Sequence, residues 1–205
     1  MNSKLFLGFV SVFAIANAAY SQNSEVQFGK TQIGIAYSSF GTNDMFYFEQ
    51  LDGANSYQSD HFFTLGLHYL HRLNPKLSIE TGIEYSHHRI IVEPNVPPNA
   101  DDRPFAANFS LISIPITLQL NLSPFFFMNG GLILDMNTSF ASDIDAQTGM
   151  GGMLGLGLGY GLPFGISTFV NPYFKVHSLL PFFSDHHPLR LLETGIRLGF
   201  MYRLP

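Results

Sequence analysis

The stretch that decides the fold is LETGIRLGFMYRL, residues 192–204. Successive side chains of a β-strand point to opposite faces, so this stretch divides into two sets of alternate residues. One set is mostly apolar and the other holds charges, glycine and one methionine: Leu192, Thr194, Ile196, Leu198, Phe200, Tyr202 and Leu204 against Glu193, Gly195, Arg197, Gly199, Met201 and Arg203. One face suited to lipid and one suited to a narrow interior predict a closing strand of a transmembrane β-barrel.

Seven earlier segments repeat this alternation: residues 31–40, 59–73, 77–91, 109–122, 125–137, 149–161 and 166–178. Long or medium connections alternate with short ones, as in outer-membrane barrels with short periplasmic turns. We therefore predict an all-β chain with an eight-stranded antiparallel up-and-down transmembrane β-barrel over residues 31–204. A secreted soluble eight-stranded barrel or sandwich is the alternative. Aromatic residues near the strand ends favour the membrane barrel, and those toward the long loops are Tyr37, Phe40, Phe62, Tyr85 and Phe109.

The composition excludes several other classes. Charged residues make up 12% of the chain, against roughly 25% in ordinary soluble domains. Beyond the N-terminus, no run approaches the roughly 20 apolar residues of a membrane-spanning helix. The chain has no cysteine for a lipid anchor or a disulfide. No basic stripe is present to neutralise phosphates, so we expect no nucleic acid as a partner.

Residues 1–21 have the features of a secretory signal peptide. Lys4 precedes an apolar run that ends near Ile15, and Ala16-Asn17-Ala18 is a small-x-small cleavage pattern. Cleavage is expected after residue 18, with a cut between residues 21 and 22 as the alternative. Export followed by barrel insertion predicts the cell outer membrane of a Gram-negative bacterium, with outer-membrane lipid and the barrel-assembly machinery as partners.

Pro115 is the one residue that fits the barrel poorly, because it interrupts the segment 109–122. A proline cannot donate to the ladder, so we expect an edge strand or a bulge there.

Five charged residues fall on the inward face and define a candidate lumen charge network: Glu80, Glu84, Lys175, Glu193 and Arg197. The interior of an eight-stranded barrel is just wide enough for side chains to meet. An unpaired charge there would be costly. We predict that Glu80 or Glu84 pairs with Arg197 and that the side chains plug the lumen. A gated pore is the alternative.

Metal and catalytic sites are not expected, and neither is a cofactor. The pair His87-His88 should point to opposite faces of a strand, and no spaced ligand pattern accompanies it or His186-His187. A lipid-modifying enzyme would need His177, Ser178 and Glu193 to act together. The consecutive pair His177-Ser178 should diverge in a regular strand, so we predict that the chain is not an enzyme.

Three segments resemble the PorT-like outer-membrane β-barrel family of Bacteroidetes-type bacteria: ISIPI at 112–116, FFFMNGGLILDM at 125–136 and GMGGMLGLGLGYGL at 149–162. The IPI step is the most specific of them, and the resemblance extends over roughly residues 31–204. It implies an outer-membrane barrel and makes Pro115 a family feature. A structural or interaction role at the outer membrane is our first expectation. Because the family's founding member is associated with protein secretion, a secretion component with a partner in that apparatus is the alternative.

The chain end also resembles the C-terminal signal that the barrel-assembly machinery recognises. The matching residues are Arg197, Gly199, Tyr202 and Leu204, and Pro205 extends past the usual terminus.

Overall fold

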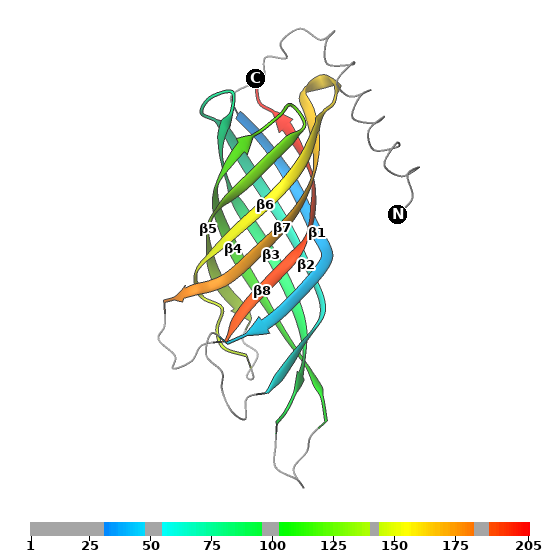
Figure 1. Ribbon diagram of the computed structural model, residues 1–205, viewed down its shortest axis with the longest axis vertical. Coiled ribbons are helices and arrows are strands. Elements are labelled where there is room, and N and C mark those ends of the chain that lie inside the picture. The colour runs from blue at the N-terminus through cyan, green and yellow to red at the C-terminus, as the bar shows by residue number, and fades with distance from the viewer. Residues whose placement is uncertain (1–30, 48–54, 96–102, 140–143, 183–188) are drawn as a thin grey trace, which may run out of the picture.

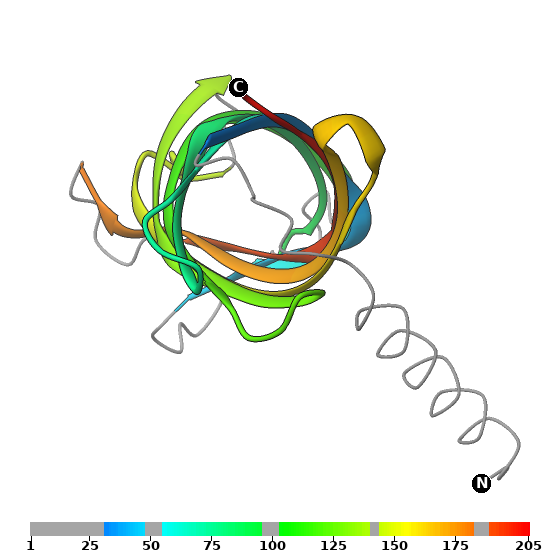
Figure 2. The same cartoon turned by 90° about the horizontal axis from the view of Figure 1, so that it is seen from above.

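The computed structural model describes residues 31–47, 55–95, 103–139, 144–182 and 189–205. Eight strands form one closed antiparallel barrel in chain order (Figures 1 and 2). They are β1 (Thr31–Phe46), β2 (Ser56–Arg72), β3 (Leu77–Glu93), β4 (Phe105–Asn121), β5 (Phe126–Ser139), β6 (Gly149–Gly161), β7 (Ile166–Pro181) and β8 (Arg190–Arg203). A short 3-10 turn, η1 (Pro163–Gly165), joins β6 to β7. The predicted fold is confirmed, and the predicted signal peptide lies outside the described residues.

The last strand closes the barrel. β8 pairs with β7 from Ile166↔Tyr202 to Val176↔Leu192 and with β1 from Gln32↔Arg203 to Phe46↔Arg190. The final stretch is therefore hydrogen-bonded to both the first and the seventh strand, as expected for the closing strand of an up-and-down barrel. The short turns lie at one end of the barrel, and the strand ends that lead into the longer connections lie at the other (Figure 1). These correspond to the periplasmic and outer ends of outer-membrane barrels.

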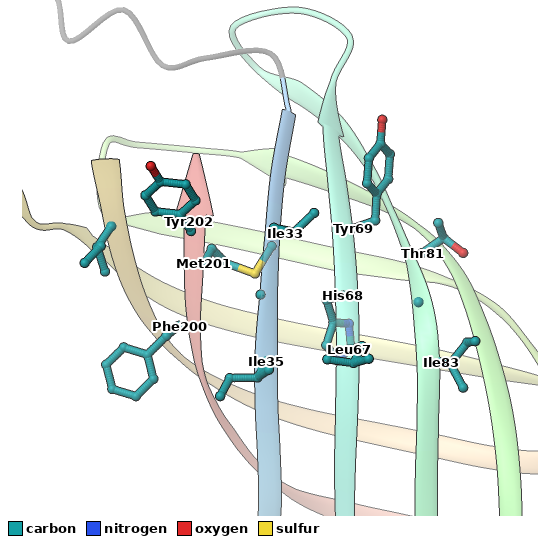
Figure 3. Close-up of a pocket in the computed structure, with 13 residues that line it drawn as sticks. Ile33, Ile35, Leu67, His68, Tyr69, Thr81, Ile83, Phe200, Met201 and Tyr202 are labelled. Carbon is teal, nitrogen blue, oxygen red and sulfur yellow. The ribbon is translucent and has the colours of Figure 1, made fainter. Parts of the chain in front are cut away.

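The outside of the barrel is apolar along every strand. Outward side chains such as Ile35 on β1, Leu67 on β2 and Leu154 on β6 are 53%, 65% and 63% exposed. A shallow apolar hollow of about 860 Å³ lies on this wall across β8, β1, β2 and β3. Tyr69 and Tyr202 flank it (Figure 3). In hydrocarbon the backbone N–H and C=O groups must be paired within the protein, and the side chains that face lipid must be apolar. The closed ladder meets the first requirement, and the apolar exterior meets the second. Among the described residues, no helix has the length and apolarity to cross a membrane.

Most strands extend further at the outer end than their alternation predicts. β1 continues to Phe46 through a register shift between Ser38 and Phe40, and β3 and β4 extend to Glu93 and back to Phe105. Toward this end of the barrel the inward side chains are mainly apolar. Buried apolar residues of the strand ends and of the adjoining connections form a small core, here named the outer cap: Met45, Ile90, Val92, Ala107, Phe109, Leu111, Ile144, Leu189 and Leu191.

Two aromatic residues predicted to face the membrane interface are buried instead. Phe62 and Phe109 are each 1% exposed. Their rings stack on His88 with centroids 5.9 and 5.1 Å away. Both share the parity of inward residues on their strands, and this parity, rather than their position near a strand end, determines which way they point.

Pro115 sits in a central strand with neither a bulge nor an open edge, contrary to expectation. On the β5 side it pairs with Ile133 without a register shift. On the β3 side the pairs Thr81↔Ile116 and Glu84↔Ser113 keep one register, and the ladder simply omits the positions between them. The missing donor of Pro115 thus leaves a local gap toward Gly82, and the flanking pairs hold the register.

A seam runs between β7 and β8 at the outer end, because their ladder stops at Val176↔Leu192. The segment before β6 fills it with side chains. The Gln147 side chain donates from Nε2 to the Leu189 carbonyl at 2.8 Å and accepts from the Leu191 amide at 3.1 Å. Asp145 accepts from the Leu189 amide at 2.9 Å. The Gln147 amide group therefore acts as a one-residue substitute for a neighbouring strand.

Candidate functional site: the charged lumen

The candidate site is the middle layer of the lumen, where β3, β7 and β8 point their charged side chains inward. The five predicted residues all lie there and are at most 4% exposed: Glu80, Glu84, Lys175, Glu193 and Arg197. We call this set, together with His68, His88, Asp135 and His177, the lumen network. Period-two alternation is what directs the five predicted side chains to the same side of the wall.

Arg197 forms the periplasmic half of the network. Its Nη1 lies 3.0 Å from Glu80 Oε1 and 3.7 Å from Glu84 Oε1. Its Nη2 donates to Asn171 Oδ1 at 3.1 Å, and the guanidinium lies 5.4 Å from the ring centroid of Phe169. The structure therefore places Arg197 against both of the glutamates proposed as its partners.

Lys175 forms the outer half. Its Nζ donates to Glu84 Oε2 at 2.6 Å and lies 3.7 Å from Glu193 Oε1. The Tyr173 hydroxyl donates to Glu193 Oε1 at 2.5 Å and is 2.7 Å from Ser38 Oγ. Glu84 thus lies between the two cations, and one continuous set of contacts links β1, β3, β7 and β8 across the lumen.

Three buried histidines and an aspartate complete the network, in addition to the five residues predicted for it. His68 lies between two glutamates, with Nδ1 3.1 Å from Glu80 and Nε2 3.5 Å from Glu84. His177 lies between Asp135 at 3.1 Å and Glu193 at 3.6 Å. His88 Nε2 is 3.0 Å from Ser86 Oγ and 3.5 Å from Glu193. Their inward parity was a signal that could have identified them.

Glycines on the inner face of β6 make room for these side chains. A Cβ on Gly155 would lie 2.5 Å from Asn129 Oδ1, and one on Gly157 would overlap the Phe127 ring. A cavity beside Lys175 and Arg197 has a volume of about 10 Å³. That volume is about the minimum that holds one water molecule. Side chains therefore fill the lumen at this level.

The residues that match the assembly signal also have structural roles. Arg197 belongs to the lumen network, and a Cβ on Gly199 would collide with the ring of Phe169. Tyr202 is 50% exposed on the lipid-facing wall. The Leu204 amide donates to the Thr31 carbonyl at 3.0 Å, which fastens the chain end to β1.

The pair His177-Ser178 does not diverge, so that prediction was wrong. Ser178 has a φ of 50°, and the β6–β7 ladder shifts register between Gly152↔Val176 and Met150↔Leu180. Both side chains are buried, at 1% and 0% exposure. Ser178 Oγ donates to the Thr148 carbonyl at 3.4 Å. A bulge of this kind breaks the period-two rule, and the sequence carries no mark of it.

The described residues contain no group of three or more His, Cys, Asp or Glu side chains arranged to hold a metal ion. His88 points inward, while His87 contacts Ser110 Oγ at 3.0 Å on the outer face. These two neighbours thus point to opposite faces, as predicted. His186 and His187 lie outside the described residues.

Comparison with known proteins identifies the fold. No protein-family model matches the chain, and no curated protein sequence matches it. Among solved structures, the outer membrane protein OprG from Pseudomonas aeruginosa is 15% identical, with a TM-score of 0.53 over 86% of this chain and 97% of that one. Ail of Yersinia pestis is 12% identical, with a TM-score of 0.48 over 86% and 100%. The N-terminal barrel domain of P. aeruginosa OprF is 14% identical, with a TM-score of 0.44 over 86% and 100%.

The likeness to OprG shows the small outer-membrane β-barrel fold. The exterior of this chain is also apolar. Together they place the chain in the cell outer membrane, as predicted.

Proposed function

We propose that this chain is a closed barrel with a structural or interaction role at the outer membrane, and that it does not conduct solutes. The observation that supports this proposal is the lumen network, in which two cations and four carboxylates are buried and contact one another or the lumen histidines. An open pore would leave these groups in water, whereas each is at most 4% exposed. The inner width of an eight-stranded barrel supports the same conclusion.

A second closure lies in series with the first. The outer cap packs Phe109, Leu111 and Leu191 across the outer mouth, each at most 1% exposed. Conduction would require both the lumen network and the outer cap to open. We propose that the barrel is an anchor that holds its outer connections at the cell surface.

Conductance in a planar lipid bilayer tests this proposal. Purified protein should give no steady open-channel current, while a porin inserted in the same way gives one. Heat-modifiable migration in gel electrophoresis should verify that the inserted barrel is folded. Steady currents from folded wild-type protein would overturn the closed-barrel function.

A role as a PorT-like component of protein secretion is the second candidate. The IPI segment supports this role because it is the most specific part of the resemblance to the PorT-like family. In the structure Ile114 and Ile116 face lipid, and Pro115 between them points inward beside the gap in the β3–β4 pairing. Cross-linking in native outer membranes, followed by purification, separates the two candidates. Stoichiometric capture of secretion components would favour this second role, and their absence would favour the stand-alone anchor.

We also propose that the chain has no enzymatic activity. His177, Ser178 and Glu193 are each at most 1% exposed, so a lipid substrate has no route to them in this conformation. Lipid A from cells that overexpress the protein should be unchanged. Loss of an acyl chain that depends on Ser178 would refute this.

A further inference from the structure

The outer end of β7 leaves the barrel wall. Its ladder with β8 ends at Val176, but its ladder with β6 continues through Met150↔Leu180 to Gly149↔Pro181. The Phe182 amide then donates to the Thr148 carbonyl at 3.2 Å. In both views the end of β7 projects sideways from the ring of strands (Figures 1 and 2).

The projection begins at the bulge around Ser178. The left-handed backbone there buries His177 and Ser178 together and so turns the next two residues outward. Leu179 packs over the outer face of β6, with its Cδ1 3.7 Å from the position of a Cβ on Gly152. Leu179, Leu180 and Phe182 are 38%, 65% and 58% exposed. We name residues 179–182 the β7 shelf.

The shelf continues the lipid-facing wall. Below it on the same strand, Phe174 is 45% exposed, and Leu154 on the neighbouring strand is 63% exposed. The run from Ile166 to Leu180 rises roughly 33–38 Å along the barrel axis, at about 3.3 Å per residue and a tilt of about 35–45°. Because the apolar band of such barrels is about 25 Å tall, a run of this length centred on the band ends roughly 5 Å beyond its outer edge, at the level of the boundary between headgroups and acyl chains.

Two features favour lipid over a protein strand as the occupant. The shelf carries no charged or hydrogen-bonding side chain, since its residues are Leu179, Leu180, Pro181 and Phe182. Pro181 also removes a backbone donor from a strand that has no β8 partner at this level, which makes the edge a poor template for an added strand. Lipid acyl chains require neither charge nor hydrogen bonds.

We propose that the β7 shelf is an interfacial anchor that inserts at the boundary between the headgroups and the acyl chains of the outer leaflet and fixes the depth of the barrel. The anchor extends sideways beyond the ring of strands, so it contacts lipid that the cylindrical wall does not reach. The proposal concerns the outside of the barrel and does not depend on whether the lumen conducts.

The chain has no tryptophan, so single tryptophans report on chosen positions without background. Leu180→Trp probes the shelf, Leu156→Trp on β6 probes the middle of the wall, and Ser56→Trp at the tip of β2 probes water. Each variant is folded into vesicles whose phospholipids carry bromine near the headgroup or deep in the acyl chains. Heat-modifiable migration verifies folding, and Phe182→Trp replaces Leu180→Trp if that variant does not fold.

Leu180→Trp should lose about half or more of its emission to the shallow bromine and less to the deep one, as expected for a group at the headgroup and acyl boundary. Leu156→Trp should respond most to the deep bromine, and Ser56→Trp to neither. Quenching of Leu180→Trp no greater than that of Ser56→Trp would overturn the proposal. Quenching that disappears as the protein-to-lipid ratio rises would also overturn it, because a second copy would then cover the shelf.

Discussion

Replacing Arg197 with methionine should destabilise the barrel strongly. Arg197 is 4% exposed and lies 3.0 Å from Glu80. Removing it leaves Glu80 in a closed lumen with His68 as its remaining ionisable neighbour. Breaking a buried ion pair by removing one partner costs about 3–5 kcal/mol, because an uncompensated charge stays behind. We expect Arg197→Met to lower the free energy of unfolding by this amount.

The chain offers a matched control in the ion pair between Arg89 and Asp60. This pair has a shorter distance, 2.8 Å, but its side chains are 52% and 40% exposed. Exposed pairs contribute about 0–1 kcal/mol, so Arg89→Met should have little effect. The two variants therefore compare the same chemistry inside and outside the lumen.

Urea unfolding in phospholipid vesicles, followed by far-ultraviolet circular dichroism, measures both variants. Adding Glu80→Gln to Arg197→Met should restore part of the loss, because it removes the stranded carboxylate. The coupling in this double-mutant cycle should fall in the range of about 0.5–3 kcal/mol. If Arg197→Met costs no more than Arg89→Met, the lumen is hydrated and the closed-barrel interpretation is refuted.

Two further predictions concern the seam and the glycines. Gln147→Ala should leave the Leu189 carbonyl and the Leu191 amide without their side-chain partners, which should lower the free energy of unfolding by about 1–3 kcal/mol for each buried group. Hydrogen exchange of the Leu191 amide should accelerate. Unchanged exchange would show that the seam is closed in another way. Gly131→Ala should cost about 1–3 kcal/mol in urea unfolding, since its Cβ would lie 2.7 Å from Thr117 Cα, whereas Gly161→Ala has nothing within 4 Å and should be nearly neutral. Equal effects of the two alanines would contradict the close packing at Gly131.

Alternation predicts most of this fold because a period of two is a property of the backbone. It identified every strand, and the predicted strand 149–161 has the same bounds as β6. It also assigned Glu80, Glu84, Lys175, Glu193 and Arg197 to one interior, since parity fixes the side of the wall.

Alternation does not show where along a strand the membrane-spanning part ends. Ile90 and Val92 share the parity of Glu84 and face inward, so an apolar residue near a strand end can belong to the outer cap rather than to the membrane face. A reversal of polarity on the inward face was the available signal for the cap. The bulge at Ser178 has no such signal, because the register between β6 and β7 is a property of their pairing.

The outer cap affects how the barrel can leave the membrane. On the hairpin of β2 and β3, the inward residues pack into the cap while Asp60 and Arg89 face solvent. Withdrawing this hairpin through the bilayer would carry Arg89 across hydrocarbon, at roughly 2–4 kcal/mol at the midplane. The cap can form only after the strand ends have crossed, and it must come apart before they return. The cap should therefore slow the extraction of the barrel and lengthen the lifetime of the inserted state.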